Sequence, residues 1–266
     1  LADNATVEPA LGVTWDGTGN GTDGTIWGGE FLLGDANGFE GVAHLRPFRR
    51  AGGETAVRDP SRSAAGVMFE LGIDLTSAPP GLDSVTERDL VVLTRMLTQR
   101  INSPITTSAG RLFDAASAMV GLATVSSFEG QGAMALEFAA SQDDPDPYPM
   151  AITKAEGPLV LDWGPMIEAM LADMGAGIDA GIVASRFHAG LERGIVEVAR
   201  QVGHPRVALT GGCFQNRILT ERTARALRAD GFEVLLHSRV PPNDGGISLG
   251  QAIVAAASTG QDPATA

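Results

Sequence analysis

Near the start of the chain, short apolar runs alternate with polar segments. Three apolar, β-rich runs lie at residues 11–15, 25–33 and 39–48. The segments between them are rich in glycine, asparagine and aspartate, which are the residues that hairpin turns favour. The pattern therefore predicts an antiparallel meander over residues 10–48.

Helical spacing dominates the middle of the chain. Ser84 and Glu87 match a capping box, Ser108 is suited to cap a helix, and Pro165 suits the first position of another. The apolar positions predict helices at residues 64–72, 84–100, 111–121, 165–174 and 179–202.

The last third of the chain predicts a strand, a glycine turn, a helix and a second strand. The strands are expected at residues 207–210 and 232–237, on either side of a helix at 217–228, and a last helix runs to about residue 257. This order is typical of a Rossmann-like or actin-like half-domain, in which glycines let backbone amides approach a nucleotide. With the meander, it predicts an α/β or α+β fold with a mixed sheet.

Composition narrows the class of partner. The chain has 266 residues, 44% of them hydrophobic, enough for one large domain or two small ones. A net charge of −13 argues against nonspecific binding to nucleic acid or acidic membranes, and no apolar run reaches the ~18 residues of a membrane span. A single cysteine, Cys213, excludes an internal disulfide and fits a reducing, cytoplasmic environment.

Two segments combine glycines with a carboxylate. Residues 16–24 are predicted to form a glycine-rich turn whose amides face phosphate oxygens while Asp16 holds a metal ion; a long hairpin turn is the alternative. Asp244 precedes a glycine pair, where it can cap a helix or hold a cation beside phosphates. No G-x-x-x-x-G-K-[ST] loop occurs, so bound ATP would need another architecture.

The remaining candidates have ordinary structural alternatives. Asp114 is expected in the first turn of a helix, where it can receive ribose hydroxyls or complement the helix dipole. His188 is expected to be structural, because none of the histidines has metal-pair spacing to another. Cys213 is expected to be a small buried residue, not a nucleophile. Arg58 and Arg62 either clamp an anion or belong to a solvated loop.

Six of these segments, taken together, resemble the C-terminal carbamoyltransferase domain of the HypF family of hydrogenase maturation proteins. They occur in the family's order over residues 10–257. The matching strings are DGTGNGTDGTIWGGEF, TSAGRLFDAASAMVGL, SFEGQGAMALE, SRFHAGL, LTGGCFQNRIL and PPNDGGISLGQA.

The resemblance implies an actin-like, ribonuclease-H-like, two-lobed ATPase fold, shared with the tRNA threonylcarbamoyl transferase family. It also implies that ATP provides a carbamoyl-adenylate. The carbamoyl group then passes to the C-terminal cysteine thiol of a HypE-like partner, on the route to the cyanide ligands of nickel–iron hydrogenase. In these families a divalent metal touches the nucleotide phosphates; iron, zinc and magnesium all remain open here.

The resemblance assigns roles to particular residues of this chain. The metal is assigned to Asp16 and Asp244. The nucleotide is assigned to Gly17, Thr18 and Gly19 in the phosphate turn, to Gly110, Asp114 and Gly130 at the ribose and adenine, and to Gly211, Gly212 and Asn216 in the second turn.

The resemblance also predicts how the chain is divided. Residues 1–80 are expected to be the remainder of an incomplete N-terminal lobe. Residues 81–257 are expected to form the nucleotide-binding lobe with its last helix at the lobe interface, and 258–266 a disordered tail. The family's H-x-x-x-H pair precedes the position of Leu1, so the chain is expected to be a fragment or a degenerate copy.

Two other functions fit the same residues. One is an O-carbamoyltransferase, or another actin-like ATPase, that acts on a small molecule. The other is a non-catalytic module that binds a nucleotide or a protein. As part of a full-length protein the chain is expected to be enzymatic; for the isolated chain both possibilities stay open.

Overall fold

The computed structural model of this protein describes residues 1–53, 58–141, 145–154 and 156–259. The predicted tail at 258–266 therefore lies outside the described residues from 260 onward. Within the described part of the chain, no helix has both the length and the apolar character needed to cross a bilayer.

The predicted meander is confirmed. Its strands are β1 (Ala10–Asn20), β2 (Ile26–Asp35) and β3 (Gly38–Leu45), and both neighbouring pairs are antiparallel. Leu11, Val13 and Trp15 alternate along β1 and are completely buried, so one face of the sheet is built into the core.

The glycine-rich turn was predicted too early in the chain. β1 continues through Asn20, and its register against β2 shifts between Trp15 and Gly19. Asp16 and Gly17 therefore belong to an irregularity within a strand pair, and the hairpin turn itself comes later, at residues 21–25. A glycine run tolerates an extended or bulged backbone as well as a turn, so composition alone did not distinguish the two.

The C-terminal β-α-β unit joins this meander in one sheet. β8 (Arg206–Thr210) pairs in parallel with β1, and β9 (Glu233–Leu235) pairs in parallel with β8. The order β3-β2-β1-β8-β9, with β2 antiparallel to its neighbours, is the arrangement expected of a ribonuclease-H-like core. The boundary predicted near residue 80 remains a prediction; strands from both sides of it share this sheet.

Four short strands extend the sheet and were not predicted. β7 (Leu159–Asp162) continues the sheet from β3, and β6 (Ala151–Lys154) forms its edge. β4 (Phe48–Arg49) and β5 (Ile105–Thr106) pair beside β2. Strands this short carry almost no periodicity of their own, and neighbouring strands determine their positions.

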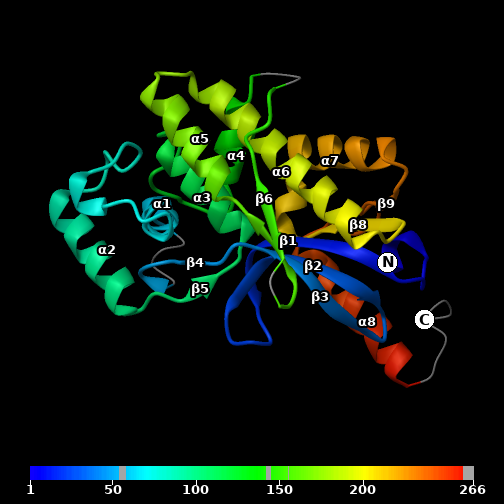
Figure 1. The fold of residues 1–266 in the computed structure, drawn as a ribbon. Helices are drawn as coiled ribbons and strands as arrows, with labels where there is room; N and C mark the ends of the chain where they lie inside the picture. Colours follow the sequence, from blue (N-terminus) through cyan, green and yellow to red (C-terminus); the bar gives the residue numbers. More distant parts are fainter. Residues whose placement is uncertain (54–57, 142–144, 155, 260–266) are drawn as a thin grey trace.

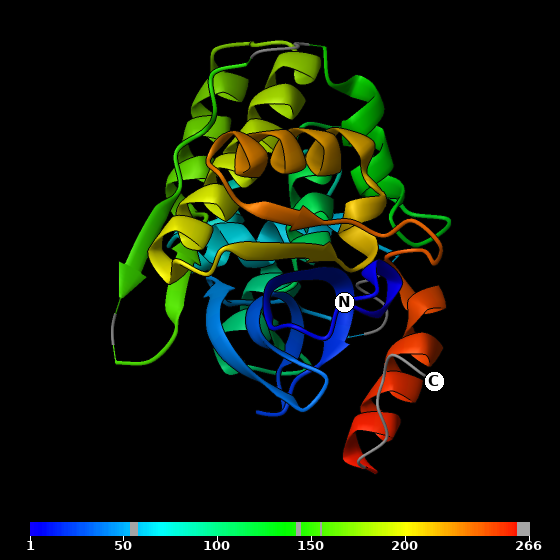
Figure 2. The same ribbon diagram turned by 90° about the vertical axis from the view of Figure 1, so that its right-hand side faces the viewer.

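The helices form two unequal layers around the sheet (Figures 1 and 2). Most pack on the face that Leu11, Val13 and Trp15 line, whereas α8 runs along the opposite side of the meander. The helices are α1 (Pro60–Glu70), α2 (Glu87–Gln99), α3 (Ala109–Met119), α4 (Gln131–Ala139), α5 (Gly164–Gly175), α6 (Ala180–Val202), α7 (Arg217–Ala229) and α8 (Ile247–Ser258).

The structure corrects one of the predicted helix caps and confirms another. Thr86, and not Ser84, caps α2, with its hydroxyl accepting a hydrogen bond from the Asp89 amide at 3.2 Å. Ser108 caps α3 as predicted and accepts from the Arg111 amide at 3.1 Å. Both caps satisfy amides that have no partner within the helix.

A groove separates α8 from the sheet. α8 is an apolar helix, but among its described residues only Ala256 is buried, and Val254 is 50% exposed. The groove has a volume of about 580 Å³ and is bordered by β1, β2 and β8 on one side and by the start of α8 on the other. Short 3-10 turns at Ala2–Asn4 and Asp244–Gly246 lie at its margin.

Candidate functional site

The groove between the sheet and α8 collects residues from distant parts of the chain. Its walls include two predicted metal ligands from the first and last thirds of the sequence. The predicted site residues that line it are Asp16, Thr18, Gly19, Gly211 and Asp244. The structure thus brings the two carboxylates to one groove, as the sequence predicted.

The backbone at Asp16 is held by the N-terminus of α3. The Ser108 hydroxyl lies 2.7 Å from the carbonyl oxygen of Asp16 and 2.8 Å from that of Gly17. A Cβ at Gly110 would lie 2.7 Å from the Cα of Gly17, which is closer than real side chains come. Gly110 is therefore required for α3 to approach β1, and the cap that begins the helix also fixes Asp16.

The turn after β8 contacts the same carboxylate from another side. A Cβ at Gly212 would lie 2.8 Å from Oδ1 of Asp16. Oδ1 also accepts a hydrogen bond from the Gly17 amide at 2.7 Å. Gly211 has φ +102°, and a Cβ there would lie 2.1 Å from the carbonyl oxygen of Trp15. The glycine pair therefore lets two strand ends meet at Asp16: a side chain at Gly211 would separate them, and one at Gly212 would displace the Asp16 carboxylate.

Asp114 lies deeper than the sequence predicted. It is in the second turn of α3, not the first, and is 3% exposed. Oδ2 is 2.9 Å from Nη1 of Arg111. Burial raises the pKa of Asp114 to about 6, although Arg111 and Arg50 act in the opposite direction. Its place near Gly132, whose Cβ would be 3.0 Å from Oδ1, comes from packing and not from the helix dipole.

Arg111 is a buried cation beside Gly17 that the sequence analysis did not single out. Its guanidinium is 2% exposed and lies between the carboxylates of Asp114 and Glu129, the latter at 3.9 Å. A Cβ at Gly17 would be 3.0 Å from Nη2 of Arg111. The spacing of Arg111 and Asp114, three residues apart in a predicted helix, was the signal that would have identified the pair.

Glu30 is a second buried carboxylate that sequence reasoning did not assign. It lines the groove and accepts hydrogen bonds from the amides of Gly28 and Gly29, at 2.6 and 2.9 Å, and from the Thr107 hydroxyl. Burial raises its pKa, against the effect of these hydrogen bonds. Because its carboxylate binds the amides of Gly28 and Gly29, Glu30 stabilises this part of the groove wall.

Asn216 is buried, and its side chain is engaged at both ends. Oδ1 accepts from the Leu219 amide at 2.9 Å and so caps α7. Nδ2 lies 2.9 Å from Nε2 of His188. Because Nδ1 of His188 lies 2.7 Å from the carbonyl of Ala184, His188 must be neutral with its proton on Nδ1. A structural role for His188 is thereby supported.

Lowering the pH should change the free energy of unfolding through the protonation of His188. Burial lowers the pKa of His188 from 6.5 to about 4. The unfolded chain therefore takes up the proton first, so His188 contributes stability that is lost as the pH falls from about 6.5 to 4, by up to about 3 kcal/mol. Asp114 acts in the opposite sense, because its raised pKa lets the folded state take up the proton first.

Comparison with a His188→Gln variant isolates the histidine contribution, because both chains retain Asp114. We expect the difference in unfolding free energy between wild type and variant, measured by urea denaturation, to shrink between pH 7 and pH 4.5. A difference that stays constant over this range would contradict a neutral, buried His188.

The other candidates lie outside the lining of the groove. Gly130 has φ +78° at the start of α4 and faces open space. Burial raises the pKa of Cys213, which opposes a thiolate and agrees with its expected structural role. Arg62 pairs with Asp59 at 2.9 Å, and neither Arg58 nor Arg62 lines the groove.

The chain's own donors fit a magnesium-type cation better than zinc or iron. Among the described residues no cluster of three or more His, Cys, Asp or Glu side chains is arranged to hold a metal. Asp16 and Asp244 line one groove. The side chain of Asn243 caps the turn, and within the described part of the chain the Asp244 carboxylate has no hydrogen-bond partner. Mg²⁺ is commonly held by one or two carboxylates together with phosphate oxygens and water, whereas zinc and iron prefer histidine and cysteine.

The chain is similar to known proteins over most of its length. Residues 12–251 match the family model described as "Carbamoyltransferase, Kae1-like Domain, second subdomain". The carbamoyltransferase HypF of Synechocystis is 38% identical over 259 residues, covering 92% of this chain and 34% of the relative. That of Rhodobacter capsulatus is 40% identical over 250 residues, covering 92% and 32%.

Solved structures show the same likeness. The crystal structure of full-length HypF in the phosphate- and nucleotide-bound form superimposes with a TM-score of 0.90 and 33% identity, covering 98% of this chain and 36% of that one. The T. kodakarensis HypF structure gives 0.80 and 27%, covering 97% and 36%. The expected α/β fold class is thus confirmed. The chain spans about a third of the length of these relatives, and it belongs to the HypF carbamoyltransferase family, within the second subdomain of the Kae1-like domain.

Proposed function

We propose that this chain is the nucleotide-binding part of the carbamoyltransferase domain of a HypF-like protein. In this proposal it holds carbamoyl-adenylate, a product of ATP, while the carbamoyl group is transferred. The observation that carries the proposal is the close approach of Gly110 and Gly212 to the backbone and side chain of Asp16, which lines the groove, in a chain that matches the family over residues 12–251. A HypF relative bound to phosphate and nucleotide supports the same ligand class.

The chain's contribution to this reaction is positioning. The acceptor is proposed to be the C-terminal cysteine thiol of a HypE-like partner. The thiol first loses its proton to water; its thiolate sulfur then bonds to the carbamoyl carbon while the bond from that carbon to the phosphate oxygen breaks, and AMP leaves with the electron pair. The chain needs no nucleophile of its own for this transfer, in agreement with the raised pKa of buried Cys213.

The same residues also bear on how the negative charge of the nucleotide phosphates is balanced. With a net charge of −13, the chain offers little general attraction for a nucleotide. Asp16 and Asp244 would hold a divalent cation, which supplies positive charge to the phosphates when bound. The glycines at positions 17, 110 and 212 leave backbone close to Asp16 without side chains that would fill the space. The remaining nucleotide assignments, Thr18, Gly19, Asp114, Gly130, Gly211 and Asn216, are part of the same proposal.

Nucleotide binding can be tested on the chain itself. We expect AMP or ATP to raise the thermal unfolding midpoint in the presence of Mg²⁺ and to do so less without it, since a ligand that binds only the folded state stabilises it. No protection by either nucleotide, with or without Mg²⁺, would contradict the proposed site.

Transfer requires a full-length protein and an acceptor. We expect Asp244→Asn in a full-length HypF-like background to reduce metal-dependent carbamoyl transfer to a cysteine-ended peptide on the order of 100-fold, because a charge that holds the phosphates' cation is lost. Asp244 is exposed, so the unfolding midpoint should not change.

The matched control is Asp83→Asn, which alters another exposed carboxylate away from the groove. Transfer that survives Asp244→Asn at matched Mg²⁺ would refute the assigned role. Transfer to a hydroxyl acceptor in place of the thiol would favour the O-carbamoyltransferase alternative.

A further inference from the structure

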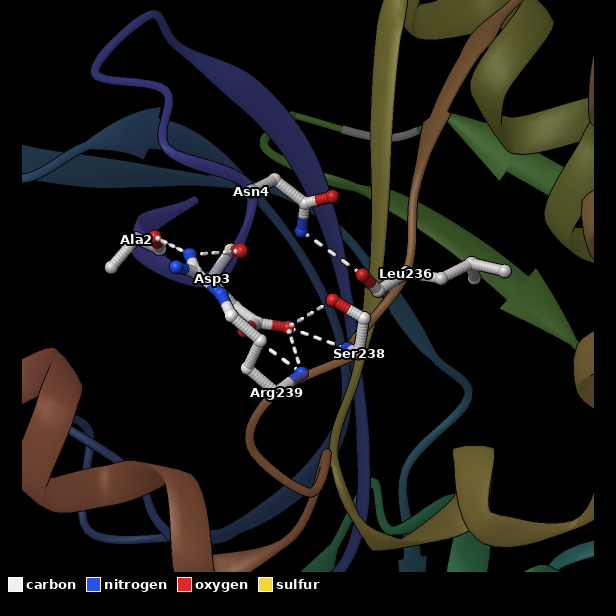
Figure 3. A network of polar contacts seen from close by, with 6 residues as sticks. All are labelled: Ala2, Asp3, Asn4, Leu236, Ser238 and Arg239. Atoms are coloured by element: carbon white, nitrogen blue, oxygen red, sulfur yellow. Dashed lines mark hydrogen bonds and ion pairs between the residues drawn. The ribbon is translucent and has the colours of Figure 1, made fainter.

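Asp3 is a buried carboxylate whose partners all come from the other end of the chain. Its side chain is 3% exposed, and it lies in the 3-10 turn Ala2–Asn4. The amides of Ser238 and Arg239 donate to its oxygens at 2.5 and 3.1 Å, and Nε of Arg239 adds a third contact at 3.2 Å (Figure 3). Hydrogen bonds from Ser238 and Arg239 lower the pKa of Asp3, so it is ionised at neutral pH.

Further hydrogen bonds join the same two segments, and one of them, from Asn4, runs in the opposite direction. Nη2 of Arg239 donates to the carbonyl oxygens of Ala2 and Asp3, and Nδ2 of Asn4 donates to the carbonyl of Leu236 at 3.0 Å. Figure 3 shows these groups interleaved at one place. Residues 236–239 are thus fixed to residues 2–4 by both main-chain and side-chain groups.

A second set of contacts fixes this segment to the sheet. Nε2 of His237 lies 2.9 Å from the hydroxyl of Thr210, and the carbonyl of Pro242 accepts from the Gly211 amide at 2.8 Å. The segment between β9 and the turn at Asp244 has no helix or strand of its own. Its course therefore depends on these contacts and on Pro241-Pro242, whose rings restrict the backbone before Asp244.

We propose that Asp3 is a positioning residue for Asp244: by holding Ser238 and Arg239 it sets the place of Asp244 in the groove that Asp16 also lines. This inference rests on the proposed function, in which those two carboxylates hold a divalent cation. In this proposal Asp3, which also borders the groove, acts through Ser238 and Arg239. Asp244 has no described side-chain partner, so the path of the backbone from Arg239 decides its position.

The test uses the chain without nucleotide and two independent readouts. Asp3→Asn keeps the shape of the side chain but removes the charge that faces Arg239. We expect amide hydrogen exchange across residues 238–246 to accelerate at least ten-fold, and Mn²⁺ affinity, followed by electron paramagnetic resonance, to weaken at least five-fold. Mn²⁺ serves here as the spectroscopic replacement for Mg²⁺.

Two further variants separate positioning from general loss of stability. Asp173→Asn removes a carboxylate that pairs with Arg186 at 2.6 Å and accepts from Tyr148, away from the groove. It should leave both the exchange at residues 238–246 and the Mn²⁺ affinity unchanged. Asn4→Ala removes only the exposed contact to Leu236 and should change both readouts in the direction of Asp3→Asn, by a smaller factor.

The outcomes distinguish this inference from the function on which it rests. If Asp16→Asn and Asp244→Asn weaken Mn²⁺ binding but Asp3→Asn changes neither readout, positioning by Asp3 is refuted and the cation site stands. If Mn²⁺ binding is insensitive to Asp16→Asn and Asp244→Asn, the cation site is refuted, and the role of Asp3 is refuted with it.

Discussion

Gly211→Ala is expected to destabilise the folded chain by roughly 3–5 kcal/mol, a large loss for the addition of one methyl group. Gly211 has φ +102° and ψ 159°, a region that is almost exclusive to glycine and costs a residue with a Cβ about 1–3 kcal/mol. The new Cβ would also lie 2.1 Å from the carbonyl oxygen of Trp15, a main-chain atom in the central strand β1. Because no side-chain rotation relieves this overlap, β8 and β1 would have to separate.

Gly231→Ala provides the matched control. Gly231 has a similar positive φ of +90°, but a Cβ there would meet no atom within 4 Å. Its substitution should lower the unfolding free energy by only about 1 kcal/mol. Both variants would be compared by urea denaturation. If the two losses were equal, the close approach of Gly211 to Trp15 would not be limiting, and the glycine would be needed for its backbone conformation alone.

Arg111→Met is expected to lower the unfolding free energy by about 3–5 kcal/mol at pH 7, because it leaves Asp114 buried without its partner. Both side chains are nearly inaccessible, at 2% and 3% exposure. The uncompensated carboxylate must either remain charged in an apolar environment or take up a proton. As the pKa of Asp114 is already raised to about 6, the loss should be smaller at pH 5 than at pH 7.

A double variant tests the cause of this loss. Arg111→Met combined with Asp114→Leu removes both charges and restores apolar packing, so it should be more stable than Arg111→Met alone. Urea denaturation of the single and double variants at both pH values gives the coupling between the two sites. A double variant less stable than Arg111→Met would show that the pair contributes to the site by packing and not by compensating charge.

The elements that the sequence predicted are those with strong local signals. The meander has turn residues between alternating runs, and α6 carries more than six turns of helical spacing, from Ala180 to Val202. The turn after β8 was found because two consecutive glycines follow a short apolar strand. Ser108 was found as a cap because a serine before a helical pattern satisfies the helix's own amides.

The predictions that failed depended on neighbours that lie elsewhere in the sequence. Strands β6 and β7 are short and take their positions from β3. Asp114 was expected near a helix end, yet the pairing with Arg111 and the packing of α3 against β1 bury it. The engagement of Asn216 with His188 joins residues 28 positions apart, and no local pattern indicated it.

The amino-acid sequence by itself determined the fold class, most helices and the glycine turn after β8. It did so because propensity, capping and turn chemistry act between residues that are close along the chain. Only the tertiary structure decided that Asp16 is enclosed by Ser108, Gly110 and Gly212, and that Asp3 holds Ser238, 235 positions away. Such contacts form when strands from both ends of the chain join one sheet, so their geometry arises from packing and not from any local pattern.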